Sequence, residues 1–166
     1  MSNKGGRRGR ITEQKAATIL MEHGYNVSEP LDPSSSLYDF IADNGTQTIK
    51  LQVKLARVRK RYYEAKLEHL AGNKRMPYVA GSFDYFVIQL PGTDTWYIIP
   101  LSVVLGRLAI SLGTVGAGKN KVKNRFTIYR NNWAQLDAPA TQTKTTSHPV
   151  PPMTFSFEGH GSFAIQ

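Results

Sequence analysis

The amino-acid sequence predicts one domain of the mixed α/β class, in which helices flank a central mixed β-sheet. Three observations support this fold class. Apolar residues recur at helical spacing near the N-terminus, an Asn-Gly pair separates two β-prone segments, and further β-prone runs flank a PGTD turn. A chain of 166 residues is long enough for one core of ordinary size, so we expect a single compact domain.

The first half of the domain begins with a helix predicted over 11–24, where apolar residues follow helical spacing and Gly24 is a stop signal. A short strand is expected over 25–27, followed by a Pro- and Ser-rich loop over 28–36. Residues 57–77 mix basic and aromatic side chains with little periodicity. For this segment we expect the end of a strand followed by a loop.

The second half of the domain begins with a hairpin whose strands cover 83–90 and 96–99, both rich in β-branched and aromatic residues. Residues 101–113 have apolar spacing compatible with a helix. A strand over 125–129 and a short helix over 131–136 are expected to complete the domain.

Composition favours a polyanionic partner. Lys and Arg number 21 against 12 Asp and Glu, which gives a net charge of +9 and an isoelectric point near 9.9. The absence of cysteine excludes disulfides, thiolate metal sites and cysteine nucleophiles. No apolar run approaches the ~20 residues of a spanning helix and no signal peptide is evident, so we expect an intracellular, cytoplasmic protein without membrane partners.

The segment 37–56 predicts a hairpin, because Asn44-Gly45 suits a type I′ turn with positive φ at both central positions. This turn would pair Asp43 with Thr46 and place Asp39 opposite Lys50. Since side chains alternate along a strand, one face would hold the polar residues Asp39, Lys50, Gln52 and Lys54. The simplest interpretation of such a face is a solvated surface backed by an apolar core.

Glu13 is the second unusual feature, because it lies on the same helical stripe as Ala16, Ala17 and Leu20. That stripe should face the protein interior. A glutamate in the first helical turn also interacts favourably with the helix dipole, which explains its presence but not its direction. An inward carboxylate needs a cation, hydrogen bonds or a metal ion.

The order Glu13 in a helix, Asp39 in a strand and Gln52-Val53-Lys54 in the next strand resembles the PD-(D/E)XK nuclease superfamily. The segments YDFIAD, LQVKLA, FDYFVIQL and WYIIP are similar to its intron-encoded homing endonucleases, which have a QxK variant of the motif. The resemblance covers about 12–136 and implies a restriction-endonuclease-like core. It divides the chain into a basic N-terminal arm (1–10), a nuclease-like domain (11–136) and a Pro/Thr-rich C-terminal extension (137–166).

The resemblance also implies catalytic roles for four residues. Asp39 would be the principal ligand of Mg²⁺ or Mn²⁺, Glu13 a second ligand and Gln52 an oxygen donor beside them. Lys54 would lie near the attacking water and the scissile phosphate, either stabilising charge or assisting deprotonation. Gln52 departs from the usual Glu or Asp, which removes one negative charge, and Tyr38 stands where the superfamily name has Pro.

Basic residues cluster near this site and are expected to contact DNA phosphates, although each cluster is also consistent with a solvated surface. The candidates are Arg7, Arg8, Arg10, Arg57, Arg59, Lys60, Arg61, Lys66, Lys119, Lys121, Lys123 and Arg125. The segment GTVGAGK (113–119) approaches P-loop spacing, but Asn120 replaces the Ser or Thr that would hold Mg²⁺. We expect it to follow a helix and precede a strand, the reverse of a P-loop.

Together with the basic composition, the resemblance implies a Mg²⁺-dependent endonuclease that acts on double-stranded DNA and is of the site-specific homing type. Because one active site must act twice to cut both strands, we also expect a homo-oligomer, a dimer or a tetramer. A Holliday junction resolvase would share the fold and the metal site. Two other classes remain open: a nucleic-acid-binding protein that retains the fold without cleavage, and a basic structural protein of a virus or ribonucleoprotein. The latter gives no reason for the inward direction of Glu13.

Overall fold

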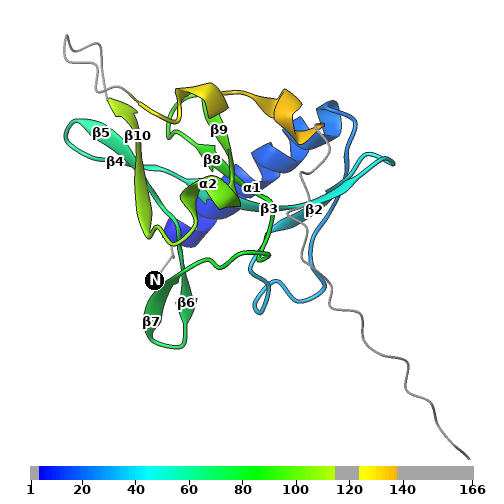
Figure 1. The fold of residues 1–166 in the computed structure, drawn as a ribbon, viewed down its shortest axis with the longest axis horizontal. Helices are drawn as coiled ribbons and strands as arrows, with labels where there is room; N and C mark the ends of the chain where they lie inside the picture. Colours follow the sequence, from blue (N-terminus) through cyan, green and yellow to red (C-terminus); the bar gives the residue numbers. More distant parts are fainter. Residues whose placement is uncertain (1–3, 115–123, 138–166) are drawn as a thin grey trace, which may run out of the picture.

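The computed structural model describes residues 4–114 and 124–137 (Figure 1). Its elements in chain order are α1 (Lys4–Glu22), β1 (Asn26–Ser28), β2 (Phe40–Asp43), β3 (Thr48–Leu55), β4 (Arg57–Val58), β5 (Tyr62–Lys66), β6 (Glu68–Ala71), β7 (Lys74–Pro77), β8 (Tyr85–Gln89), β9 (Trp96–Pro100), α2 (Leu101–Val104), β10 (Ala109–Thr114) and the 3-10 helices η1 (Thr127–Tyr129) and η2 (Trp133–Leu136).

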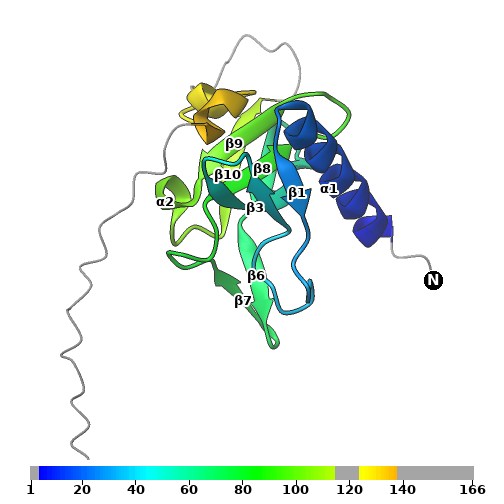
Figure 2. The ribbon, with the colours of Figure 1, turned by 90° about the vertical axis from the view of Figure 1, so that its right-hand side faces the viewer.

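A five-stranded sheet in the order β1-β2-β3-β8-β9 forms the centre of the domain. Its neighbouring strands are antiparallel except for β3 and β8, which run parallel. The sheet is therefore mixed, as the sequence predicted. Figure 2 shows α1 lying beside this sheet. The 3-10 helix η2 contributes Leu136 to the same core as α1, whereas α2 and β10 pack on the opposite face.

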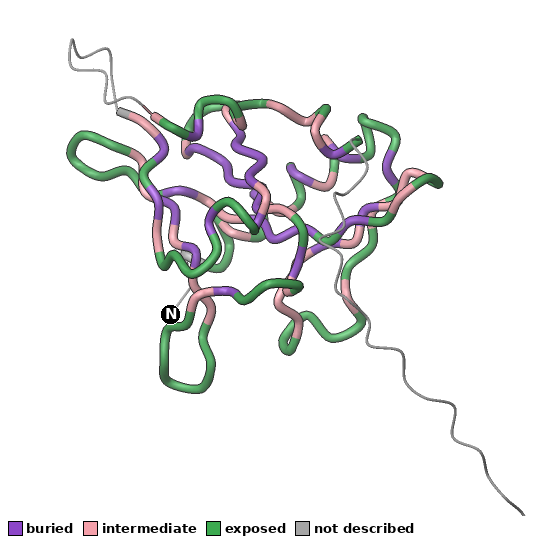
Figure 3. Tube along the Cα trace, in the orientation of Figure 1, coloured by how far each residue is buried: buried purple, intermediate pink, exposed green. Residues whose placement is uncertain are grey.

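The central sheet separates two hydrophobic cores. The core between α1 and the sheet includes Ala16, Leu20, Phe40, Leu51 and Val87. The core on the opposite face includes Phe86, Ile88, Ile99, Leu101 and Ile110. Because β8 contributes alternate residues to both cores, its central residues Phe86, Val87 and Ile88 are all apolar. Figure 3 shows these buried segments at the centre of the molecule.

Two smaller sheets extend from the central one. The first has the order β10-β5-β4, and the second is the hairpin of β6 and β7. This β6–β7 hairpin projects from the body of the domain, and most of its residues are exposed or half-buried (Figures 1 and 3). Within the described ranges, no helix is long and apolar enough to cross a membrane.

The prediction for residues 57–77 was wrong, because this segment forms the four strands β4 to β7. The strand β5 is fixed by pairing with β10, for example Ala65 with Ile110, and the Ala65 side chain is completely buried. A partner more than 40 residues away leaves no local signal in the sequence. The basic residues in this segment also interrupt the alternation of apolar and polar residues that would indicate strands.

The predictions for the last part of the domain also need correction. The helix expected over 101–113 covers only Leu101–Val104, and after Gly106, which has a φ of 74°, the chain forms strand β10. The strand expected over 125–129 is the 3-10 helix η1. The short helix expected over 131–136 is present as the 3-10 helix η2.

The first helix is longer than predicted, because α1 begins at Lys4 rather than at Ile11. Most of the basic segment 1–10 is therefore helical. Glu13 is consequently in the middle of the helix, and the favourable effect of a first-turn carboxylate on the helix dipole does not account for it.

Candidate active site

At one end of its strands, the central sheet brings together the end of β1, the start of β2 and the end of β3. The pairing of β2 with β3 sets Asp43 opposite Thr48 and Phe40 opposite Leu51. The predicted register, with Asp43 opposite Thr46, was wrong by two residues. A shift of two keeps each side chain on its predicted face, and it places Asp39 next to Gln52 instead of Lys50.

The turn chemistry explains this register. Only Gly45 of the Asn44-Gly45 pair has positive φ, so the predicted type I′ turn does not form. Instead, the side-chain oxygen of Asn44 accepts hydrogen bonds from the backbone N–H groups of Thr46 and Gln47, both at 3.0 Å, and from the Thr46 hydroxyl at 2.8 Å. This cap stabilises a longer loop over 44–47.

Asp39 is held firmly against β3. Its backbone N–H donates to the Leu51 carbonyl at 2.8 Å. Its Oδ2 atom accepts hydrogen bonds from the Gln52 side-chain amide at 2.6 Å and from the Val53 backbone N–H at 2.7 Å. Burial raises the pKa of Asp39, while the Val53 N–H, Lys54 and Gln52 act in the opposite direction. The carboxylate is thus preorganised and poorly solvated.

Gln52 is buried, with 6% of its surface exposed. The hydrogen bonds that its side chain makes to described residues use Nε2, which donates to Asp39 and, at 3.3 Å, to the Val53 carbonyl. Because the amide nitrogen faces the carboxylate, the Oε1 atom remains for another ligand. A polar group this deeply buried contradicts the interpretation of this face as a solvated surface.

Lys54 lies on the same face as Gln52, one alternation further along β3, and is half-buried. Its Nζ atom lies 5.4 Å from the ring centroid of Tyr78. Burial lowers the pKa of Lys54, and the negative charges of Asp39 and Glu13 partly offset this effect. The ammonium group therefore interacts electrostatically with both carboxylates.

Glu13 reaches this end of the sheet from α1. The helix packs against the sheet through Ala16 and Leu20, which are completely buried, and Glu13 is half-buried. Burial raises the pKa of Glu13, the charge of Asp39 raises it further, and Arg10 and Lys54 lower it. The four predicted residues are thus electrostatic neighbours, as the sequence pattern suggested.

Lys50 shares the polar face but does not join this group. Its ammonium lies 5.2 Å from the ring centroid of Tyr38, and its backbone N–H donates to the Asp84 carboxylate at 2.7 Å. The residue is exposed. The polar face therefore divides into an exposed part at Lys50 and a buried part at Gln52 and Lys54.

Glu29 is an acidic neighbour that sequence reasoning missed. It follows β1 directly, and the pairing of Ser28 with Ile41 brings this end of β1 to the start of β2. Burial is the main cause of the raised pKa values of Glu13 and Asp39, and the charge of Glu29 contributes at both. The Pro/Ser-rich surroundings of Glu29 resemble an ordinary loop, so no sequence signal singled it out.

The donor set suits a hard divalent cation with open positions. No group of three His, Cys, Asp or Glu side chains is arranged to hold a metal ion within the described ranges. Asp39, Glu13 and the Gln52 amide oxygen supply two carboxylates and one neutral oxygen. Mg²⁺ is commonly bound by one or two carboxylates, with water and substrate phosphate completing its shell, so these residues fit such an ion.

Sequence comparison gives the family. Residues 3–136 match the PD-(D/E)XK endonuclease family over most of the chain. The protein belongs to this endonuclease family. A search of curated protein sequences found no significant match.

The fold of this PD-(D/E)XK endonuclease is also found in a solved structure. The bacterial homing endonuclease I-Ssp6803I shares 25% sequence identity, and the two structures superpose with a TM-score of 0.70. The alignment covers 81% of this chain and 93% of the other. This similarity confirms the predicted fold class and the resemblance to homing endonucleases.

The predicted DNA-contacting residues of this PD-(D/E)XK endonuclease occupy several surfaces. Arg7, Arg8 and Arg10 are exposed on α1. Of the 57–66 cluster, Arg57, Arg59, Lys60 and Arg61 are exposed and Lys66 is half-buried, with Arg59 paired to Glu64 at 2.8 Å. Arg125 is exposed and lies over the Phe126 ring. Lys119, Lys121 and Lys123 lie outside the described residues.

The segment 113–119 begins within strand β10 (Ala109–Thr114), so the expectation that it follows a helix was wrong. Most of this P-loop-like segment lies outside the described residues. The case against a P-loop rests on Asn120, which replaces the Mg²⁺-binding hydroxyl of that motif.

Proposed function

We propose that this endonuclease is a Mg²⁺- or Mn²⁺-dependent enzyme that hydrolyses phosphodiester bonds of double-stranded DNA at specific sites, as a homing endonuclease does. The observation that supports it best is the hydrogen-bonded pair of Asp39 and Gln52, which lies beside Lys54 and Glu13 at one end of the central sheet. The net charge of +9 suits a DNA substrate.

Asp39, Glu13 and Gln52 would hold the divalent ion, through carboxylate and amide oxygens. When bound, the ion supplies an activated water and neutralises charge on the phosphoryl oxygens. The hydrogen bonds from Val53 and Gln52 keep the Asp39 carboxylate in one orientation before substrate arrives. This preorganisation reduces the reorganisation needed in the transition state.

Lys54 would face the same phosphate. Its ammonium stabilises the negative charge that develops on the phosphoryl oxygens, while packing over Tyr78 restricts its position. Burial favours the neutral amine, so the cost of losing its proton near the attacking water is reduced. Both effects require Lys54 to remain near Asp39.

One such site cuts one strand, so a double-strand break requires two sites or two successive reactions. The homing endonuclease I-Ssp6803I supports the site-specific alternative over junction cleavage. We therefore propose a homo-oligomer, a dimer or a tetramer, in which two copies of this site act on opposite strands of a duplex.

The experiment uses supercoiled plasmid and a four-way junction as substrates for the wild type and Asp39→Asn, each with Mg²⁺ or with EDTA. The proposal predicts Mg²⁺-dependent cutting of duplex DNA by the wild type alone. Cutting by Asp39→Asn, or in EDTA, contradicts the proposed mechanism. Cutting confined to the junction would instead identify a resolvase.

A further inference from the structure

A basic cavity of about 280 Å³ opens next to the proposed catalytic lysine. The residues of its lining that matter here are Lys54, Arg57, Lys66, Glu68, His69 and Arg75. Four of these side chains are cationic and one is a carboxylate. Since Lys54 also belongs to the group around Asp39, the cavity adjoins the proposed active site.

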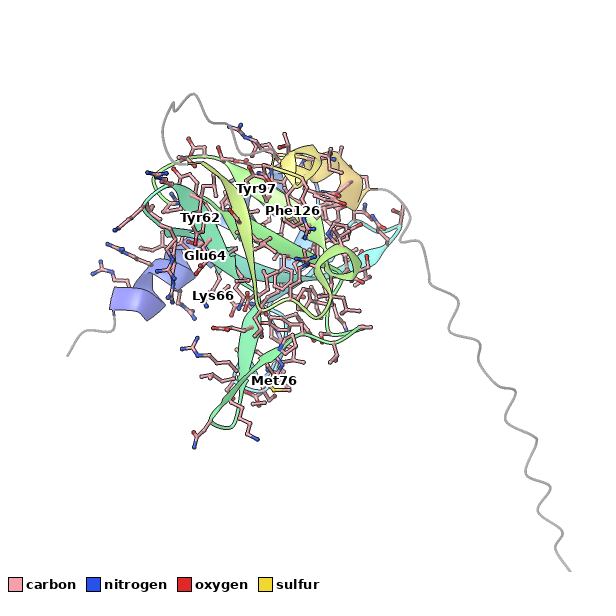
Figure 4. The ribbon with its side chains drawn as sticks, turned by 60° about the vertical axis from the view of Figure 1, so that its left-hand side comes forward. Tyr62, Glu64, Lys66, Met76, Tyr97 and Phe126 are labelled. Atoms are coloured by element: carbon pink, nitrogen blue, oxygen red, sulfur yellow. The ribbon has the colours of Figure 1, made fainter. Side chains whose placement is uncertain are left out.

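The walls of this cavity come from strands that sequence analysis did not foresee. Arg57 is on β4, Lys66 ends β5, and Glu68 and Arg75 lie on the two strands of the β6–β7 hairpin. Figure 4 shows Tyr62, Glu64 and Lys66 following one another along β5 toward the hairpin that bears Met76. The hairpin thus forms one wall, and the end of β5 another.

The internal contacts of the cavity leave a net positive charge. Glu68, whose side chain is 9% exposed, forms an ion pair with Arg75. The pair orients the guanidinium of Arg75, whose side chain is 66% exposed. It also uses the only carboxylate among the described residues that line the cavity. Among the described residues, Lys66 forms no ion pair, and its charge acts on Glu64, which is paired with Arg59. The ammonium group of Lys66 can therefore still bind an anion.

Tyr78 connects the cavity to the active site. Its ring lies 5.0 Å from the His69 ring and 5.4 Å from the Lys54 ammonium, measured to the ring centroids. Tyr78 is itself buried and packs edge-on against Phe83 and Phe86. The wall between the two sites is therefore anchored in the core rather than in a surface loop.

We propose that this cavity binds a DNA phosphate adjacent to the scissile one on the same strand, with Lys66 and Arg75 as its joint cationic contacts. The identity of the ligand rests on the proposed function, because Lys54 would then face the scissile phosphate. Two cations and a restricted volume suit one phosphate group better than a base. The β6–β7 hairpin then lies alongside the DNA beyond the cleavage position.

Salt-dependent binding tests this proposal. A labelled mixed-sequence duplex is titrated with the wild type, Lys66→Gln, Arg75→Gln and the double variant, with Ca²⁺ replacing Mg²⁺, between about 50 and 200 mM salt. The slope of log K against log salt is negative, and each lost phosphate contact makes it shallower by about 0.9. Arg130→Gln is the control, because Arg130 lies beyond β9, bonded to Thr95, and has no part in the cavity.

If Lys66 and Arg75 share one phosphate, the slope of the double variant should be shallower than that of the wild type by the equivalent of about one phosphate contact. The slope of each single variant should change by less. A change in the slope of the double variant equivalent to about two contacts would show that Lys66 and Arg75 bind separate phosphates, and would overturn the proposal. Slopes equal to that of Arg130→Gln would also overturn it. Thermal unfolding verifies that each variant is folded. Plasmid cleavage by the wild type and by Asp39→Asn, measured in parallel with Mg²⁺, tests the proposed function separately: cleavage by the wild type alone supports the chemistry, whereas the salt slopes test the cavity.

Discussion

Gln52 donates its side-chain amide to the Asp39 carboxylate across 2.6 Å, so a neutral group directly contacts the proposed principal metal ligand. In the usual form of the motif this position is acidic. A glutamate here would set two carboxylates at hydrogen-bond distance inside a poorly solvated site. The Gln52 amide avoids this repulsion when no cation is bound. It also leaves the site with less negative charge to attract a cation.

We therefore expect Gln52→Glu to destabilise the metal-free protein, by about 1–3 kcal/mol, because a buried acceptor replaces a donor. Mn²⁺ should restore much of that loss, since it binds the folded state more tightly when a second carboxylate is present. Thermal unfolding with and without Mn²⁺ measures both effects. Gln89→Glu is a matched control, because Gln89 is also buried but bonds the Thr93 carbonyl rather than a carboxylate. Equal Mn²⁺ rescue of the two variants would contradict the prediction.

Glu29 is expected to compensate for the charge that Gln52 lacks. Glu29→Gln should weaken Mn²⁺ binding about three- to tenfold, which corresponds to about 1 kcal/mol of long-range attraction. Asp32→Asn removes an equal charge from the same loop and should have little effect, because Asp32 is bonded to Ser34 and does not act on Asp39 or Glu13. Isothermal titration measures the affinities. Addition of Gln52→Glu to Glu29→Gln should restore binding, and failure to do so would disprove compensation.

Glu13→Gln should stabilise the metal-free protein at neutral pH, by about 0.5 kcal/mol. Burial and the charge of Asp39 raise the pKa of Glu13 above its ordinary value of 4.5, so the folded state binds this proton more tightly than the unfolded state. The stability of the wild type therefore falls as pH rises through the pKa that Glu13 has in the folded state. Glu13→Gln cannot ionise at this position and does not lose stability in this way. The advantage should disappear below pH 4.5 in urea unfolding curves. An advantage that persists in acid would contradict this cause.

Tyr25 joins the start of β1 to the end of the described domain, because its hydroxyl donates to Asp137 at 2.7 Å. Burial and this bond raise the pKa of Tyr25 from 10.0 to about 12. Its stabilising contribution is therefore full below pH 10.0 and is lost as pH rises toward about 12. Tyr25→Phe should cost about 1 kcal/mol at neutral pH and make unfolding less sensitive to pH in this window. Denaturant unfolding at several pH values measures this, and an unchanged pH dependence would refute it.

The faces of the hairpin strands were predictable, whereas their register was not. Alternation fixes which residues share a face, and a two-residue slip preserves it, so Asp39, Gln52 and Lys54 were correctly grouped. The slip depends on the side-chain cap that Asn44 makes within its own loop. Glu13 was predictable for a similar reason, since helical spacing places it on the stripe of Ala16 and Leu20.

What sequence reasoning missed depends on pairing between distant segments. Strand β10 exists because it pairs with β5, although its sequence has apolar spacing that a helix also permits. The same pairing turns residues 57–66 from an apparent loop into a sheet, and so forms the wall of the basic cavity. Glu29 was missed because β1 pairs with β2 and carries this loop residue to the site.

The most direct test of the central claim separates Asp39 from Lys54. Single-turnover plasmid cleavage and Mn²⁺ binding are measured on the same preparations of wild type, Asp39→Asn and Lys54→Met. We expect Asp39→Asn to lose both, with cleavage reduced about 10³-fold, and Lys54→Met to keep Mn²⁺ binding while losing cleavage to a similar degree. Wild-type rates in either variant, or unchanged Mn²⁺ affinity in Asp39→Asn, would contradict the account.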